Sequence, residues 1–124
     1  MSRIFHITTL NASLAARQSG IYRTDSLEKD GFIHFSQRQQ ILGVANAFYT
    51  AQTDLVILVV DVSRLQAELK YEPPVHPSAS TSAPAADQLF PHLYGPLNFD
   101  AVEAVIAFPL GPDGKFSLPA ALPE

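Results

Sequence analysis

The chain has 124 residues, a net charge of −4 and no cysteine, and 47% of its residues are hydrophobic. This length predicts a single domain over residues 1–124, and the apolar content excludes a wholly disordered chain. The lack of cysteine excludes disulfides, thiolate zinc sites, iron–sulfur clusters and thiol nucleophiles. Because the chain has only eight Lys and Arg and twelve Asp and Glu, we expect no affinity for long nucleic acids.

The apolar runs are too short to enter a membrane. The longest, at residues 55–60, falls far short of the ~20 residues that a membrane-spanning helix needs. The first six residues, MSRIFH, lack the long apolar core of a signal peptide. We therefore expect a cytoplasmic protein that does not bind membranes.

A strand and a helix are expected at the N-terminus. Residues 4–8 are branched and aromatic around a histidine, which predicts a strand. Residues 11–20 predict a helix, because Thr9 or Asn11 can cap its first N–H groups. Gly20 can end this helix in the left-handed conformation.

A second strand and helix follow. Residues 31–36 predict a strand that again carries a histidine. Ser36 precedes Gln39 by three residues, which is the spacing of a capping box, so Ser36 is expected to open a helix that runs to about residue 49. The apolar residues of this helix recur at helical spacing, at Ile41, Val44, Ala45 and Phe48.

The second half of the chain is expected to be mostly strands. Residues 54–62 predict a central strand buried on both faces, because they form a continuous run of Val, Ile and Leu. The Pro-, Ser- and Ala-rich segment at residues 73–88 predicts a loop, and we expect it to be a mobile flap near a pocket. Two β–α pairs followed by strands indicate an α+β fold. Further strands are expected at residues 21–23, 70–72, 101–110 and around Phe116. One helical turn is expected at residues 63–66, and a turn at Asp30-Gly31, where the charged segment 25–30 ends.

Three histidines sit between large apolar residues: His6, His34 and His92. Each could be a core histidine that is satisfied by a carbonyl group, because a buried imidazole needs partners for its two nitrogens. Three such residues in one small core instead favour imidazoles that converge on a shared cavity. A three-histidine zinc site is chemically sound, but the usual spacing of two ligands one helical turn apart is missing, so we expect no metal.

The second strand and helix also predict an anion site. His34 and Ser36 project from one face of the strand. The helix that follows offers free N–H groups and the positive end of its dipole to an anionic oxygen. With Arg23 and Arg38 nearby in the sequence, a phosphate or pyrophosphate could bind here. The alternative is a solvated pair of arginines and a serine that only caps the helix.

The aromatic segment at residues 90–97 could form a flat wall for a nucleobase or a nicotinamide ring. Tyr94 would supply a hydroxyl group, and Gly95 would permit a close approach of the backbone to the ligand. The alternative is a rigid turn that packs on the core.

Three blocks of the sequence resemble the signature blocks of a small bacterial family that is catalogued only as a domain of unknown function. The blocks are IFHIT at residues 4–8, DGFIHFS at 30–36 and FPHLYGPL at 90–97. The resemblance implies an ADP-ribosyltransferase-like fold, near the branch of the RNA 2'-phosphotransferases, with a split mixed or antiparallel sheet and two helices. That branch carries a histidine on its first strand, a second on a later strand, and a hydrophobic residue in place of a catalytic Glu.

The resemblance implies that His6 holds the nicotinamide ribose and that His34 is the second catalytic histidine. It leaves the missing Glu open, since Glu103 lies in the right part of the chain but could face outward. The implied cofactor is NAD or another nucleotide that contains ADP-ribose. The expected ligand-binding residues are Thr8, Arg23, Ser36, Arg38, His92, Tyr94 and Gly95.

These residues favour an NAD- or ADP-ribose-utilising transferase or hydrolase that acts on a small phosphorylated acceptor. Such a reaction needs mainly an oriented ribose and a held pyrophosphate, because the pyridinium is already a good leaving group. The expected partner is thus a small nucleotide or a phosphorylated metabolite. The alternatives are a non-catalytic module that binds nucleotides or proteins and, with weaker support, a three-histidine metal protein.

Overall fold

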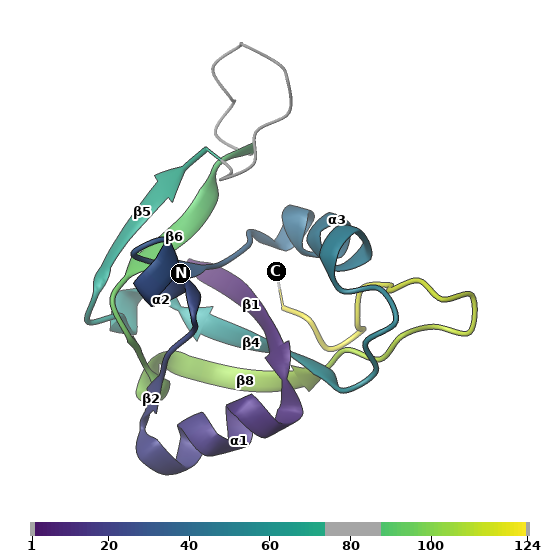
Figure 1. Cartoon of the computed structure of the whole chain (residues 1–124), viewed down its shortest axis with the longest axis horizontal. Coiled ribbons are helices and arrows are strands. Elements are labelled where there is room, and N and C mark those ends of the chain that lie inside the picture. The colour runs from purple at the N-terminus through teal and green to yellow at the C-terminus, as the bar shows by residue number, and fades with distance from the viewer. Residues whose placement is uncertain (1, 74–87, 124) are drawn as a thin grey trace.

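Strands and helices alternate along the first half of the chain, and strands dominate the second half (Figure 1). The computed structural model describes residues 2–73 and 88–123. The strands are β1 (Arg3–Thr9), β2 (Ile21–Tyr22), β3 (Ile33–His34), β4 (Leu55–Asp61), β5 (Glu68–Glu72), β6 (Phe90–Tyr94), β7 (Leu97–Asn98) and β8 (Val102–Ala107). The helices are α1 (Leu10–Ser19), α2 (Ser26–Lys29) and α3 (Arg38–Phe48), and 3-10 turns lie at Val62–Arg64 and Phe99–Ala101.

The central sheet has the order β1-β4-β8, and both of its pairings are antiparallel. Every residue of β4 is buried. This confirms the prediction that residues 54–62 form a strand covered on both faces. A strand of this kind needs a packing layer on each side of the sheet.

Alternate residues of β4 pack into two separate hydrophobic cores. Val56, Leu58 and Val60 pack in one core with Ala16 of α1 and with side chains of β3 and β6. Leu55, Ile57 and Val59 pack in the other core with Ile41 of α3 and with the C-terminal segment. Figure 1 shows α1 and α3 on opposite sides of this sheet. The period of two along β4 thus decides which helix each residue meets.

A second antiparallel sheet, β3-β6-β5, is joined to the first by one isolated backbone bridge among the described residues. There, Ser36 N donates to Phe5 O at 2.7 Å and Phe5 N donates to Ser36 O at 2.9 Å. Beyond this bridge β1 and β3 separate, so the strand system is split between the two histidine-bearing segments. All strand pairs among the described residues are antiparallel, including the short pair β2–β7. The expected α+β class and split sheet are therefore present, without parallel pairing in the described strands.

The first predicted helix is confirmed at both of its ends. Thr9 caps α1 by accepting a hydrogen bond from Ala12 N at 3.1 Å. Gly20 ends the helix with a φ of 84°, a conformation that glycine adopts without a steric penalty.

The start of the second helix differs from the prediction. Gln37, not Ser36, is the N-cap of α3, and Gln37 and Gln40 form the capping box. The reason is that Ser36 keeps an extended backbone to pair with Phe5.

Three smaller predictions are also wrong. Two helices were expected, but the charged segment 25–30 contains a third, the short helix α2. The segment around Phe116 forms no strand, and Phe116 N donates instead to Asn46 Oδ1 at 2.8 Å. Residues 90–97 contain β6 and the start of β7, so the alternative of a rigid turn is wrong, whereas the aromatic wall stays a prediction. Most of the predicted flap, residues 74–87, lies outside the described residues.

Across residues 2–73 and 88–123, every helix falls short of the length and hydrophobicity that a bilayer crossing requires.

Candidate functional site

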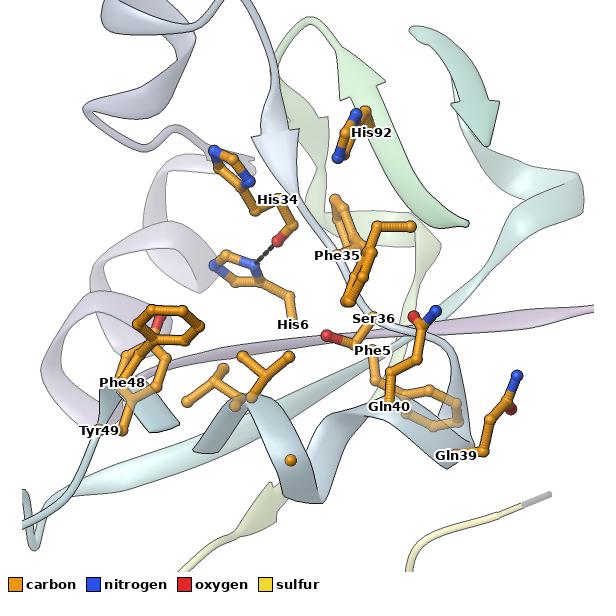
Figure 2. A pocket seen from close by; sticks show the side chains of 14 residues that line it. Phe5, His6, His34, Phe35, Ser36, Gln39, Gln40, Phe48, Tyr49 and His92 are labelled. Carbon is orange, nitrogen blue, oxygen red and sulfur yellow. Dashed lines mark hydrogen bonds between the residues drawn. The ribbon is translucent and has the colours of Figure 1, made fainter. Parts of the chain in front are cut away.

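A cavity of about 680 Å³ opens where β1 and β3 separate (Figure 2). Its size lies within the range that holds small-molecule ligands. One end carries the imidazoles of His34 and His92, and α3 forms the opposite side. The aromatic rings in its wall belong to Phe5, Phe35, Phe48, Tyr49 and Phe90.

A smaller hollow of about 370 Å³ shares four lining residues with this cavity, including His6 and His34. Thr8, Thr24 and Ser26 give its wall several hydroxyl groups. The two cavities therefore adjoin at the split between the strands, one mainly aromatic and the other rich in hydroxyls.

His6 is buried, and both of its ring nitrogens have partners. Nδ1 lies 2.6 Å from the main-chain oxygen of His34, as the dashed line in Figure 2 shows. Because a carbonyl oxygen only accepts, Nδ1 carries the proton, and Nε2 of the neutral ring accepts from the Tyr22 hydroxyl, 2.8 Å away. The Tyr22 oxygen lies 2.9 Å from Thr8 Oγ1.

Burial outweighs the hydrogen bond to His34, which by itself would raise the pKa of His6. Burial lowers the pKa of its imidazole from 6.5 to about 4, so the ring is neutral near pH 7. Burial likewise raises the pKa of the Tyr22 phenol. His6 therefore holds β1, β2 and the end of β3 together. Both of its nitrogens are already hydrogen-bonded to the protein, so neither is available to a ligand.

His34 is the more accessible of the two predicted catalytic histidines, with 43% of its side chain exposed. Its Nε2 lies 2.9 Å from Asp30 Oδ2, so a carboxylate holds one side of the ring. The ring centroid of His34 lies 4.7 Å from that of Phe32 and 5.6 Å from that of His92. The structure thus brings the three predicted histidines to one cavity, where they differ in exposure and in hydrogen-bond partners.

His92 is packed tightly at the edge of the cavity. Its Nδ1 lies 2.9 Å from Glu72 Oε1, and its ring stacks on Phe32 with centroids 4.0 Å apart. Burial lowers the pKa of the His92 imidazole, against the opposing effect of the Glu72 carboxylate. Tyr94 also donates to Glu72, and the two hydrogen bonds lower the pKa of that carboxyl group. Tyr94 therefore supports Glu72 and is absent from the walls of both cavities.

The structure does not assemble the predicted anion site. Arg23 is exposed and lines neither cavity, and Arg38 Nε donates to the Pro123 oxygen at 3.1 Å. The side chains of Gln37 and Gln40 satisfy N–H groups at the start of α3 that an anion would otherwise bind. Of the four residues, only His34 and Ser36 line the larger cavity, whose wall contains no Lys or Arg.

Three further candidates are placed by the structure. Thr8 lines the smaller hollow. Gly95 permits a close approach, but to the protein itself, because a Cβ at this position would lie 2.8 Å from Ala67 Cβ. Glu103 pairs with Arg3 and lines neither cavity, so it does not supply the missing catalytic Glu.

Sequence reasoning missed the two carboxylates that hold the histidines. Asp30 is part of the DGFIHFS block, four residues before His34, and that spacing was a usable signal. Glu72 lies 20 residues before His92, and only the pairing of β5 with β6 brings them together. Phe48 and Tyr49, at the end of α3, were also missed.

The histidines do not form a metal centre in the described part of the chain. There, no group of three or more His, Cys, Asp or Glu is arranged to hold a metal ion. The carboxylates instead pair singly with His34 and His92.

Two kinds of solved structure resemble this fold. A crystal structure of protein CC0527 from Caulobacter crescentus is 30% identical, with a TM-score of 0.75 and 94% of each chain covered. A solution NMR structure of CC0527 is 29% identical, with a TM-score of 0.74, and the match covers 93% of this chain and 91% of that one. Their descriptions name no activity, and they lend no support to the expected likeness to ADP-ribosyltransferases.

No curated protein matches the chain. A family model described as "Protein of unknown function (DUF952)" matches residues 7–105. This match spans most of the chain and contains the strands and helices that surround both cavities. The chain therefore belongs to the DUF952 family.

Proposed function

We propose that the larger cavity binds the nicotinamide end of NAD or of a related nucleotide, as part of a transferase or hydrolase site. The observation that carries this proposal is the aromatic cavity at the split between β1 and β3, with the imidazoles of His34 and His92 at its edge. An apolar pocket with a few convergent polar groups is the usual form of a small-molecule site.

The chemistry of the wall favours a planar, positively charged ring. The oxidised nicotinamide ring is both, and aromatic faces such as those of Phe48 and Tyr49 attract cations. No Lys or Arg in the wall opposes this charge. The same lack of cations disfavours a phosphate inside the cavity, so the pyrophosphate would lie outside it.

The ribose is best placed beside the smaller hollow. Hydroxyl groups of Thr8, Thr24 and Ser26 line this hollow, and they can exchange hydrogen bonds with sugar hydroxyls. His34 lines both cavities and would contact the ligand directly. His6 would act as a positioning residue, because its hydrogen bond holds the backbone of His34.

The experiment is a comparison of melting temperatures with NAD, nicotinamide mononucleotide and ADP-ribose, which lacks the nicotinamide. A ligand at 100 times its Kd stabilises a protein by about 2.7 kcal/mol, which shifts Tm by several degrees. We expect the first two ligands to raise Tm and ADP-ribose to raise it less. No shift with any of them overturns the proposal, and an equal shift with ADP-ribose contradicts the placement of the nicotinamide.

A further inference from the structure

His92 differs from His6 in what its second nitrogen does. Both nitrogens of His6 are hydrogen-bonded to the protein, whereas the Nε2 of His92 has no hydrogen-bond partner among residues 2–73 and 88–123. Within the same residues, no fully buried side-chain nitrogen or oxygen lacks a partner. The Nε2 of His92 is therefore not sealed in the core, and the residue lines the larger cavity.

The orientation of this imidazole is fixed from several sides. Glu72 Oε1 accepts from His92 Nδ1 at 2.9 Å, and the Tyr94 hydroxyl donates to the same oxygen. The Phe32 ring stacks at 4.0 Å with an angle of 20° between the planes. A neutral imidazole whose Nδ1–H points at a carboxylate presents a lone pair at Nε2. This is the arrangement of a base and its orienting group in catalytic triads.

We infer that His92 is the general base of this site, oriented by Glu72, and that it removes a proton from a water molecule that attacks the bound nucleotide. The inference rests on the proposed function and deepens it, because it assigns hydrolysis as the reaction. No comparable role fits His6, since its Nε2 already accepts from Tyr22.

The step balances without a further reactant. The water oxygen forms a bond to the ribose carbon while its proton passes to Nε2 of His92. The bond from that carbon to the ring nitrogen breaks, and its electron pair goes to the nitrogen. Nicotinamide leaves as a neutral molecule that needs no acid, and the proton on His92 returns to solvent.

The surroundings of His92 suit a base near neutral pH. Burial keeps the pKa of the imidazole below its usual value, so the unprotonated form dominates at pH 7. Glu72 opposes that effect and keeps the ring more basic than burial alone would. The titratable groups that face it are Glu72 and Lys70 on β5, Tyr94 on β6, His34 on β3 and Asp30 before β3.

The first test measures nicotinamide release from NAD by chromatography and NAD binding by calorimetry. His92→Asn keeps an N–H group near Glu72 but removes Nε2. Loss of a general base lowers turnover by roughly 100-fold or more, so we expect this loss with an unchanged Kd for NAD. Leu14→Ala, on the exposed face of α1 and outside both cavities, is the matched control and should leave both quantities unchanged.

The second test is the pH profile of Glu72→Gln. This variant keeps an oxygen that accepts from His92 but removes the charge that raises its pKa. We expect the acid limb of kcat/KM to move to lower pH. If Glu72 had only a structural role, its replacement would lower the rate without moving the acid limb of the pH profile.

The outcomes separate this inference from the proposed function. The inference is overturned, and the binding proposal stands, if NAD binds but no nicotinamide is released. The same holds if His92→Asn turns NAD over at the wild-type rate. Absence of NAD binding overturns both. If His92→Asn does not fold, the Glu72→Gln profile decides alone, and an unmoved acid limb overturns the inference.

Discussion

The Nδ1 atom of His6 donates a hydrogen bond to the main-chain oxygen of His34, 2.6 Å away. One residue earlier, Phe5 and Ser36 are joined by two main-chain hydrogen bonds. The imidazole therefore takes the place of the next main-chain contact between the two segments. It holds them together while the backbones separate, and the cavity lies at this separation. The burial of His6 is thus part of what shapes the site.

This buried imidazole predicts a loss of stability in acid. Burial lowers the pKa of His6 from 6.5 to about 4, so the unfolded chain binds the proton more readily than the folded one. The stabilisation is complete above pH 6.5 and is lost as the pH falls toward 4, by about 3 kcal/mol in total. Urea unfolding at pH 7, 5.5 and 4.5 measures it. His6→Asn, which cannot titrate, should show a shallower dependence, and parallel curves for the two proteins would contradict this account.

The Tyr22 hydroxyl should also contribute to stability. It lies between His6 Nε2 and Thr8 Oγ1, at 2.8 Å and 2.9 Å. Tyr22→Phe leaves both groups without this partner, which costs about 1–3 kcal/mol of unfolding free energy. Tyr71→Phe is the control, because 44% of Tyr71 is exposed, and it should change stability by less than about 0.5 kcal/mol. Equal effects of the two substitutions in urea would show that the network is not stabilising.

Local signals in the sequence were enough to predict several elements. Thr9 and Gly20 mark the ends of α1 through capping chemistry that depends only on neighbouring residues. The unbroken apolar run of β4 requires cover on both faces, and α1 and α3 provide it. The histidine blocks also indicated a shared cavity, since an apolar setting repeated at distant positions suggests a common environment.

Long-range contacts decided what the sequence could not predict. Ser36–Gln39 and Gln37–Gln40 both have capping-box spacing, and the pairing of Ser36 with Phe5 selects the second. Proximity in sequence likewise did not show where Arg38 points, because its partner Pro123 is 85 residues away. Such choices depend on tertiary packing, which local spacing does not encode.

The glycines predict opposite effects of the same substitution. A Cβ at Gly95 would lie 2.8 Å from Ala67 Cβ, so Gly95→Ala should cost about 1–3 kcal/mol through overpacking. Gly43 lies within α3, and apart from its chain neighbours and the backbone of its own helix no atom lies within 4 Å of such a Cβ. Gly43→Ala should therefore stabilise the protein by about 0.5–1 kcal/mol, since alanine favours helix. Chemical denaturation measures both changes, and a stabilising Gly95→Ala would contradict the close approach of the two segments.

Phe48 offers a test of binding that is separate from folding. Its side chain is 69% exposed yet lines the larger cavity, so its truncation removes an aromatic face and little of the core. Phe48→Ala should weaken NAD binding by about 2- to 13-fold, which corresponds to the ~0.5–1.5 kcal/mol of an aromatic contact. Leu14→Ala removes a comparably exposed side chain from α1 and should leave the affinity unchanged. Calorimetry measures both affinities, and an unaltered Kd in Phe48→Ala would place the nicotinamide away from this wall.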